Sequence, residues 1–314
     1  MAGGDGLRIG TRASALARWQ AEHVAALLRA IPDAPEPELV LIKTEGDRIQ
    51  DVPLSQVQGS AFFTKEIEEA LLQNRVDVAV HSLKDLATEM PPGLELGAVL
   101  QREDPRDVLI ARGPVTLEDL PQGARVGTSS LRRRAFLSAW RPDLTLLELR
   151  GNVPTRIEKL EDGRYEAIVL AAAGVKRLGL EERISSYLPF ERFLPAVSQG
   201  AIGVQIRAGD QETAAWIGSL DHGPTRMTTT AERAFLRTVE GGCHAPVGAF
   251  GTLNGETLHL RGMVSALDGS QSVSGEISGP AKGAHSLGVK LARDILSRGG
   301  EEILARLGRA GSGD

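Results

Sequence analysis

The stretch Arg8-Ile9-Gly10-Thr11-Arg12-Ala13-Ser14 decides the fold of this chain, because a similar one, Arg125-Val126-Gly127-Thr128-Ser129-Ser130, recurs later. Each begins with a short apolar run, turns at Gly-Thr and ends on a serine that can cap a helix. In such a strand–turn–helix unit, the first N–H groups of the helix and its dipole point at whatever lies above the turn. We therefore predict two similar β/α lobes that face each other across a cleft.

The segments around these two stretches read as further strands and helices of the same lobes. After the first turn, Leu16, Trp19, His23, Leu27 and Ala30 have the three- and four-residue spacing of a helical apolar face. The charged linker 102–107 is expected to cross into the second lobe. The run 195–204 is expected to return as a strand, with Gln199-Gly200 at the crossing point. The predicted domains are 1–101 with 199–221, then 102–198, and finally 222–314.

The last part of the chain has a different pattern. Residues 225–239 read as a helix whose buried face would be Met227, Ala231, Ala234, Phe235 and Val239. Three antiparallel strands at 247–254, 256–267 and 271–278 are separated by Asn-Gly and Asp-Gly turns. A helix over 284–298 completes a small α+β domain. The predicted fold class is thus α/β, with two lobes and this third domain.

Composition excludes several classes of protein. The 314 residues carry a net charge of −5, which argues against general nucleic-acid binding. The single cysteine rules out an internal disulfide framework and favours a reducing compartment. No leader-like segment and no apolar run of ~18 residues is present, so we expect a cytoplasmic protein that does not bind membranes. There is no Walker A motif, no dinucleotide fingerprint and no zinc-type spacing, and we expect no metal.

The lone cysteine lies in Glu240-Gly-Gly-Cys243-His-Ala-Pro-Val-Gly248. A lone cysteine is often only a small buried apolar residue. Here two glycines precede it, and they allow a bulky partner to approach the sulfur closely. The thiol would then be a nucleophile or an attachment point. Because no residue stands out as its general base, covalent attachment is favoured over hydrolysis.

Polar residues gather where the predicted strands end. His81, Ser82, Lys84 and Asp85 follow one strand within five residues, whereas Arg12 and Ser14 follow another. Ligand groups in open α/β sheets cluster at such carboxyl ends. Any one of these residues could be a helix cap or a solvated loop residue. In the second lobe five arginines occupy strand ends or helix starts, and this pattern indicates a ligand with several carboxylates or phosphates: Arg132, Arg133, Arg150, Arg156 and Arg177. We expect the neighbouring Arg134 to face solvent.

Six motifs together resemble the porphobilinogen deaminase family, also called hydroxymethylbilane synthases, in order along nearly the whole chain: 9–14 with Trp19-Gln20, 80–86, 126–133, 149–152, 195–200 and 241–243. The resemblance implies two lobes like type II periplasmic binding proteins, and a third domain that carries the cysteine. The implied reaction joins four porphobilinogen molecules head to tail with release of ammonia, giving hydroxymethylbilane. The implied cofactor is a dipyrromethane bound to Cys243 through a thioether.

The resemblance also implies roles for individual residues. Asp85 matches the catalytic aspartate, which would stabilise the cation left when the aminomethyl nitrogen departs and would shuttle protons. Gln20 and Gln199 match positions near the cofactor and substrate. The pyrrole acetates and propionates would be bound by a polar and basic set: Arg12, Ser14, Ser82, Lys84, Thr128, Ser130, Arg132, Arg133, Arg150, Arg156 and Arg177.

The chain departs from the family pattern in two places. Gln56 and Ser60 stand where the family commonly has lysines, so we expect this loop to give weaker electrostatic help. Ser198 stands where glycine is usual, and we expect that change to be minor. Two alternatives remain at this stage: an inactive homologue, or a binding protein for a di- or tricarboxylate on the same two-lobed fold. In either case we expect a monomer whose partner is a small molecule.

Overall fold

A computed structural model describes residues 6–44, 64–240 and 245–310 of the chain. These residues form two compact units. The first unit contains the described residues up to 103 together with Gly200–Arg226. The second contains Asp104–Gln199 and the described residues from 227 onward. The predicted limits of the three domains stay predictions.

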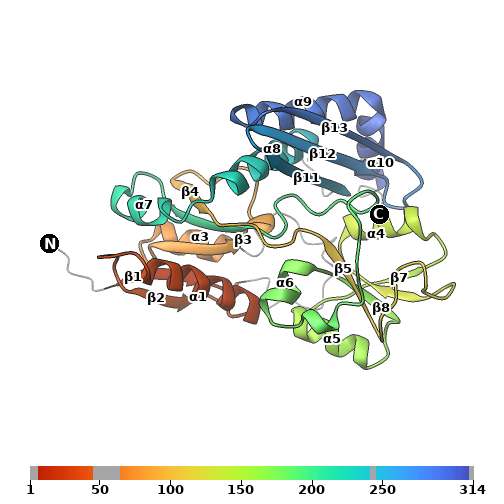
Figure 1. Ribbon diagram of the computed structural model, residues 1–314, viewed down its shortest axis with the longest axis horizontal. Coiled ribbons are helices and arrows are strands. Elements are labelled where there is room, and N and C mark those ends of the chain that lie inside the picture. Colours follow the sequence, from red (N-terminus) through yellow and green to blue (C-terminus); the bar gives the residue numbers. More distant parts are fainter. Residues whose placement is uncertain (1–5, 45–63, 241–244, 311–314) are drawn as a thin grey trace. The chain divides into compact units, whose positions relative to one another are not determined.

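The first unit is built on a five-stranded mixed sheet with the order β2-β1-β3-β10-β4 (Figure 1). Its strands are β1 Leu7–Thr11, β2 Pro37–Leu41, β3 Val78–Ser82, β4 Leu94–Val99 and β10 Ile202–Arg207. Strand β1 runs parallel to β2 and β3, whereas β10 runs antiparallel to β3 and β4. The predicted return strand after Gln199-Gly200 is therefore confirmed, and it occupies an interior position of this sheet.

Helices cover both faces of this sheet. Helices α1 (Ala15–Arg29) and α7 (Gln211–Gly218) pack on one face, and α3 (Lys65–Leu72) packs on the other. The predicted apolar face of α1 was wrong by about one position. The fully buried residues are Gln20, Ala21, Val24, Ala25 and Leu28, while Ala30 is exposed. Small residues let the helix backbone approach the sheet closely, so Ala21 and Ala25 lie between the helix and the sheet. The larger Trp19 stays half-buried at the side and stacks on His23.

The second unit repeats this sheet. Its order is β7-β6-β8-β5-β9, in which β6 runs parallel to β7 and β8, and β5 runs antiparallel to β8. Strand β5 thus takes the position that β10 takes in the first unit, and the predicted repetition of the two lobes is confirmed at this level. The bounds are β5 Asp107–Ala111, β6 Arg125–Gly127, β7 Thr145–Leu147, β8 Ala167–Ala171, β9 Ser186–Tyr187, α4 Leu131–Trp140, α5 Val153–Glu161 and α6 Ala172–Arg177.

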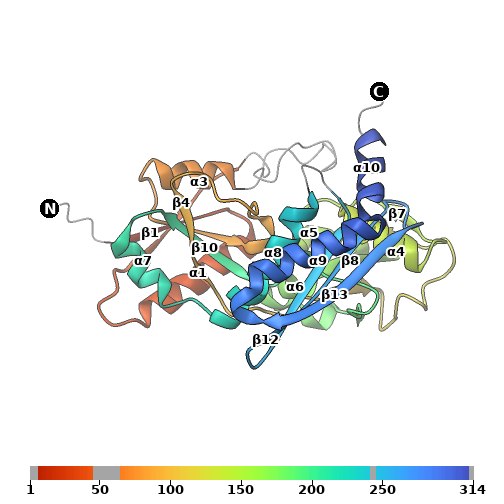
Figure 2. The same ribbon diagram turned by 90° about the horizontal axis from the view of Figure 1, so that it is seen from above.

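The second unit also contains a three-stranded antiparallel sheet, β11-β12-β13, as predicted. Figure 2 shows α9 lying along it, and α8 supplies Ala231, Phe235 and Val239 to the same core. Met227, one turn before Ala231, was wrongly predicted to be buried, since it is 37% exposed and does not belong to this core. A last helix, α10, was not predicted from the sequence. The bounds are α8 Gly223–Glu240, β11 Val247–Asn254, β12 Thr257–Ser265, β13 Ser272–Pro280, α9 Ala284–Ile295 and α10 Glu301–Ala310.

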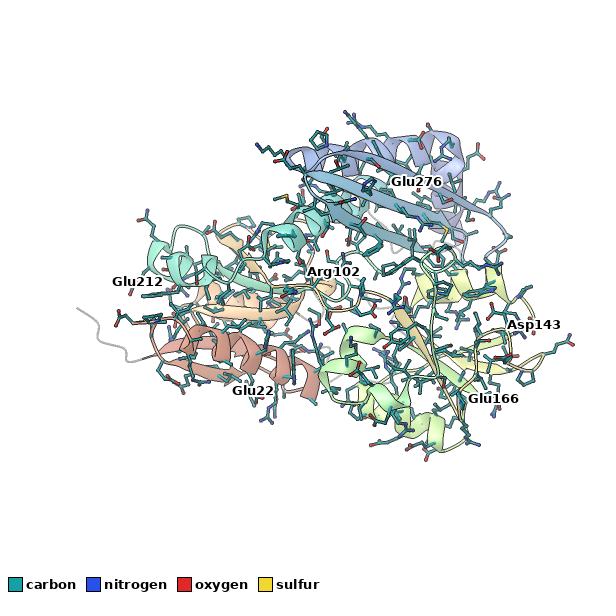
Figure 3. All side chains as sticks on the ribbon, in the orientation of Figure 1. Glu22, Arg102, Asp143, Glu166, Glu212 and Glu276 are labelled. Carbon is teal, nitrogen blue, oxygen red and sulfur yellow. The ribbon has the colours of Figure 1, made fainter. Side chains whose placement is uncertain are left out.

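Charged side chains occur both on the surface and in the interior. Glu22, Glu212 and Glu276 are exposed on the elements that carry them (Figure 3). The buried charges have both signs, and they include Arg132, Arg133 and Asp107. In the part of the chain that the structure covers, no helix is both long and apolar enough to span a membrane.

Candidate active site

The first unit has a small cavity at the carboxyl ends of β1 and β3. The two strands are parallel neighbours, so their ends meet at one edge of the sheet. The cavity measures about 70 Å³. Its lining comes from the β1–α1 turn, the first turns of α1, the end of β3 and the residue before α3: Arg12, Ser14, Leu16, Ala17, Gln20, Thr64, Val80, His81, Ser82 and Asp85.

Asp85 is held at this edge by the local backbone. Strand β3 ends at Ser82, and a single 3-10 turn, Leu83–Asp85, follows it. Leu83 is fully buried and anchors the turn, so the half-buried Asp85 side chain stays at the cavity. The adjacent Lys84 is exposed and does not line the cavity. The turn therefore places Asp85 at the cavity and leaves the neighbouring Lys84 exposed.

A buried amide connects α1 to the same strand end. Gln20 is 2% exposed, and its Nε2 donates to Ser82 Oγ at 2.9 Å. Ser14 caps α1 by accepting from the backbone N–H of Ala17 at 3.3 Å. The structure thus brings five of the predicted site residues to one cavity: Arg12, Ser14, Gln20, Ser82 and Asp85.

The second unit has the equivalent edge at the carboxyl ends of β7, β6 and β8. Thr128 and Ser130 follow β6, and Ser130 caps α4 by accepting from the backbone of Arg133 at 3.4 Å. Arg150 follows β7, Arg156 lies on α5, and Arg177 ends α6 after β8. The predicted residues of this unit therefore come from the turns and helices that follow its three parallel strands.

Two arginines of this edge are paired with one buried aspartate. Arg132 and Arg133 bind Asp107 at 2.8 and 2.7 Å, and their side chains are 6% and 7% exposed. Burial alone would raise the pKa of Asp107, but the two guanidinium groups outweigh it and lower the pKa to about 2. Asp107 is therefore ionised at neutral pH. Two cations facing one anion leave a net charge of +1 among these three side chains.

Gln199 belongs to the same cluster. Its Nε2 donates to the backbone oxygen of Pro105 at 2.8 Å and lies 3.2 Å from Asp107 Oδ1. The side chain is 1% exposed. Gln199 therefore links the segment where the chain enters the second unit, near Asp104, to the segment where it leaves, at Gln199 itself.

Some buried donors at this edge lack a hydrogen-bond partner within the described residues. They are Arg132 Nε and Arg150 Nη1. Buried polar groups are normally satisfied, so unpaired guanidinium N–H groups beside a net positive charge fit a ligand that carries carboxylates. Arg156 Nε, by comparison, already donates to the Gly151 oxygen at 2.7 Å.

Three residues of interest lie outside the described residues: Cys243, Gln56 and Ser60. Among the residues that can be described, no group of three or more His, Cys, Asp or Glu side chains could hold a metal ion.

The place of Asp107 beside the arginines was not predicted, because 102–107 reads as a charged linker in the sequence. An acid directly before the apolar run Val108-Leu-Ile-Ala111 was the available signal, since a charge at the start of a buried strand needs a partner. Thr64 also lines the cavity, and nothing in the sequence placed it there.

Family models and several known proteins are similar to this chain. The family model for the porphobilinogen deaminase dipyromethane cofactor binding domain matches residues 7–215, and the model for the C-terminal domain of the same family matches 227–297. The porphobilinogen deaminase of Syntrophomonas wolfei is 51% identical over 95% of this chain and 97% of its own. That of Geobacter sulfurreducens is 50% identical over 96% of this chain and 94% of its own. A periplasmic substrate-binding protein of an ABC transporter from Coxiella burnetii is 14% identical, with a TM-score of 0.44 over 72% of this chain and 96% of that one.

The family models extend over almost all of both units, and the relatives match from end to end. The chain belongs to the porphobilinogen deaminase family.

Proposed function

We infer that this chain is a hydroxymethylbilane synthase, which joins four porphobilinogen molecules head to tail and releases ammonia at each addition. The observation that carries this function is the match of both family models and of relatives about 50% identical along the whole chain. An arginine-rich edge with unpaired buried donors supports it, because every pyrrole of the product carries two carboxylates.

The cofactor is a dipyrromethane, the group named by the family model that covers most of the chain. When bound, it supplies the pyrrole carbon to which the first substrate molecule is joined. We propose that Cys243, the only cysteine, attaches it. Arg132, Arg133 and Arg150 would hold its carboxylates, together with the hydroxyl groups of Thr128 and Ser130. The substrate would be bound through Arg12, Ser14, Ser82, Lys84, Arg156 and Arg177, with Gln20 and Gln199 beside it.

Asp85 is proposed as the catalytic residue. Loss of the aminomethyl nitrogen leaves a positive charge on the substrate ring, delocalised onto the pyrrole nitrogen. A fixed carboxylate lowers the energy of that charge where it develops, and it can pass protons between successive steps. The anchored turn Leu83–Asp85 supplies such a fixed carboxylate. The protein is further proposed to be a cytoplasmic monomer that binds neither nucleic acid nor membranes.

The test is intact-mass measurement with turnover. The purified protein should be heavier than its sequence by one dipyrromethane, and Cys243→Ala should remove that excess. Asp85→Asn should keep the excess mass but lower kcat by roughly 10²–10³-fold, the usual loss when a group that stabilises developing charge is removed. An unmodified wild-type mass after incubation with porphobilinogen would refute the function. Near-normal turnover of Asp85→Asn would refute only the role of Asp85.

A further inference from the structure

A buried hydroxyl links the two turns of the second unit that carry proposed binders of the cofactor's carboxylates. Ser129 Oγ donates to the backbone oxygen of Leu149 at 2.8 Å and accepts from the N–H of the same residue at 3.1 Å. Ser129 is 8% exposed and Leu149 is fully buried. The neighbours of Ser129 in sequence are Thr128 and Ser130. Leu149 directly precedes Arg150, so the two hydrogen bonds, here named the Ser129 clip, join both turns.

The clip continues the contact between two strands beyond the point where they separate. Strands β6 and β7 pair up to Gly127 and Leu147, and the N–H of Thr128 adds one more bond to the Leu147 oxygen at 2.9 Å. After this point β6 leads into the turn before α4, and β7 leads into the segment before α5. Buried backbone groups require partners, and a hydroxyl can both donate and accept. Ser129 therefore supplies the partner that the strand ladder no longer gives to Leu149.

The backbone oxygens around Arg150 are held by side chains in the same way. Tyr165 OH donates to the Glu148 oxygen at 2.6 Å, and Lys159 Nζ donates to the Arg150 oxygen at 2.9 Å. Side-chain donors thus occupy four consecutive backbone oxygens, 148–151. The main chain on both sides of Arg150 is therefore anchored residue by residue.

The side chain of Arg150 is not occupied in the same way as its main chain. Arg150 Nη1 is buried and has no hydrogen-bond partner among the described residues. Ser129, in contrast, already donates its only hydroxyl proton to Leu149, so it has none to offer to a carboxylate. Arg150 thus has a donor for a ligand, whereas Ser129 can act only on the main chain that carries Arg150.

We propose that Ser129 and Tyr165 are positioning residues that act through Arg150, by fixing the main chain from which its guanidinium reaches the cofactor's carboxylates. The inference rests on the proposed function and deepens it. An arginine side chain has high rotamer entropy, and a fixed main chain reduces the number of positions that its guanidinium can take. Because binding then requires less ordering, a carboxylate is bound more tightly. Neither positioning residue touches the ligand itself.

The first test compares Ser129→Ala with a matched control, Ser185→Ala. Ser185 Oγ accepts from the Ala111 N–H at 2.9 Å and donates to the Ala111 oxygen at 3.5 Å, at the opposite end of the same sheet. Both variants should lower the urea midpoint, but only Ser129→Ala should lower kcat and the fraction of chains that carry the cofactor mass. We expect a fall in kcat on the order of tenfold, since a misplacement of about 1 Å can cost ~10²-fold. Normal kcat and loading in Ser129→Ala, or equal losses in Ser185→Ala, would overturn the proposal.

The second test needs no turnover and uses citrate, a tricarboxylate, as the probe. It is made in chains with Cys243→Ala, which lack the proposed attachment point of the cofactor. Binding is followed as the rise of the unfolding midpoint in citrate relative to chloride at equal ionic strength. Ser129→Ala should weaken citrate binding on the order of tenfold, the loss expected from one impaired charge-assisted hydrogen bond. In an Arg150→Ala background the same substitution should have no effect, because the clip then has no guanidinium to position.

The two tests separate the positioning role from the proposed function. Equal effects of Ser129→Ala on citrate binding with and without Arg150 would overturn the role, even if the wild type makes hydroxymethylbilane. Coupling between the two residues in a chain whose wild type lacks synthase activity would refute the function and leave the role standing. If Ser129→Ala does not fold, Tyr165→Phe takes its place, since it keeps the ring and removes only the bond to the Glu148 oxygen. Citrate binding as strong in Tyr165→Phe as in its parent chain would then overturn the proposal.

Discussion

At the scale of single residues, Ser198 shows how a substitution that looks minor in sequence becomes costly in structure. Its φ is +62°, in the left-handed region that favours glycine, and the residue is fully buried. Its Oγ is buried without a hydrogen-bond partner among the described residues, whereas its N–H donates to Glu232 Oε2 at 2.7 Å. The positive φ and the unpaired hydroxyl therefore predict that serine is costly here, in contrast to the expectation of a minor change.

Ser198→Gly should stabilise the protein. A non-glycine residue in the left-handed region costs about 1–2 kcal/mol, and an unsatisfied buried hydroxyl costs about 1–3 kcal/mol. Glycine also makes the unfolded chain more flexible, and this lowers the gain by roughly 0.5–1 kcal/mol. We expect a net gain of about 1–4 kcal/mol, measured as a higher urea midpoint. Ser198→Ala removes only the hydroxyl and should gain less. A lower midpoint for Ser198→Gly would mean that the positive φ is not a source of strain.

At the neighbouring position 200, by contrast, the chain has the glycine that the backbone requires. Its φ is +90°, and a Cβ there would lie 2.3 Å from the backbone oxygen of Glu103. Glu103 N–H also donates to the Gly200 oxygen at 3.1 Å. The crossing point predicted from the sequence is thus a place where two backbone segments touch, and only glycine permits that approach.

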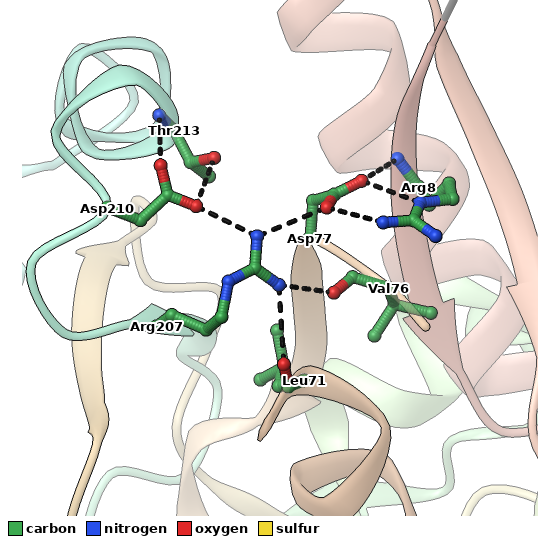
Figure 4. A network of polar contacts seen from close by, with 7 residues as sticks. All are labelled: Arg8, Leu71, Val76, Asp77, Arg207, Asp210 and Thr213. Carbon is green, nitrogen blue, oxygen red and sulfur yellow. Dashed lines mark hydrogen bonds and ion pairs between the residues drawn. The ribbon is translucent and has the colours of Figure 1, made fainter. Parts of the chain in front are cut away.

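At the scale of elements, the first sheet is tied together at the end opposite the cavity. Asp77, directly before β3, accepts three hydrogen bonds from Arg8 of β1 and one from Arg207 of β10 (Figure 4). Arg207 also donates to the backbone oxygens of Leu71 and Val76 and pairs with Asp210, which caps α7. One carboxylate therefore connects the return strand to the two strands that end at the cavity.

This network predicts how stability depends on pH. Burial would raise the pKa of Asp77, but its bonds to Arg8 and Arg207 outweigh that effect and lower the pKa. Because the folded pKa is the lower one, the contribution is fully present above the unfolded value and is lost as pH falls through the folded value. Asp77→Asn should lose about 2 kcal/mol of unfolding free energy at pH 7, as expected for charge-assisted hydrogen bonds.

The measurement is urea unfolding of wild type and Asp77→Asn from pH 7 down to pH 2, since the loss begins near the unfolded pKa of about 3.9 and is complete only below the folded pKa. The two curves should converge at the acid end. Asp162→Asn is the control, because Asp162 and Arg164 form an exposed pair at 3.7 Å that should add little at any pH. A constant difference between wild type and Asp77→Asn across this range would show that ionisation of Asp77 is not the cause.

The elements also show what the sequence could and could not predict. Both Gly-Thr turns and the hairpin turns were predictable, because glycine and the capping residues leave few local conformations. The buried face of α1 was not, since the sheet selects Ala21 and Ala25 for their small size rather than the bulkier residues nearby. Ion pairs such as Asp107 with Arg132 join residues far apart in sequence, and no local pattern encodes them.

At the scale of the whole molecule, one part of the candidate site could be predicted from the sequence and another part could not. The residues that line the first-unit cavity follow strand ends, which apolar runs locate well. The function of the arginine edge depends on which guanidinium groups remain unpaired, and that depends on partners supplied by the fold. The sequence could therefore name the arginines but could not show that Asp107 already binds two of them.

The net charge of −5 bears on how a substrate with two carboxylates approaches the protein. An acidic molecule repels anions over a distance of about one Debye length, ~8 Å at physiological salt, unless local cations outweigh that field. Gln56 and Ser60 lack the charge that the family commonly has at these positions. Gln56→Lys with Ser60→Lys should lower the KM for porphobilinogen several-fold at low salt, and added salt should remove the gain.

The control must separate local charge from total charge. Gln122→Lys with Thr252→Lys places two cations at exposed positions elsewhere and brings the net charge to the same −3. If the effect is local, only the Gln56/Ser60 pair changes KM and its salt dependence. Equal changes in both double variants would assign the effect to the field of the whole molecule. An unchanged KM in the Gln56/Ser60 variant would show that the missing lysines do not limit substrate capture in this chain.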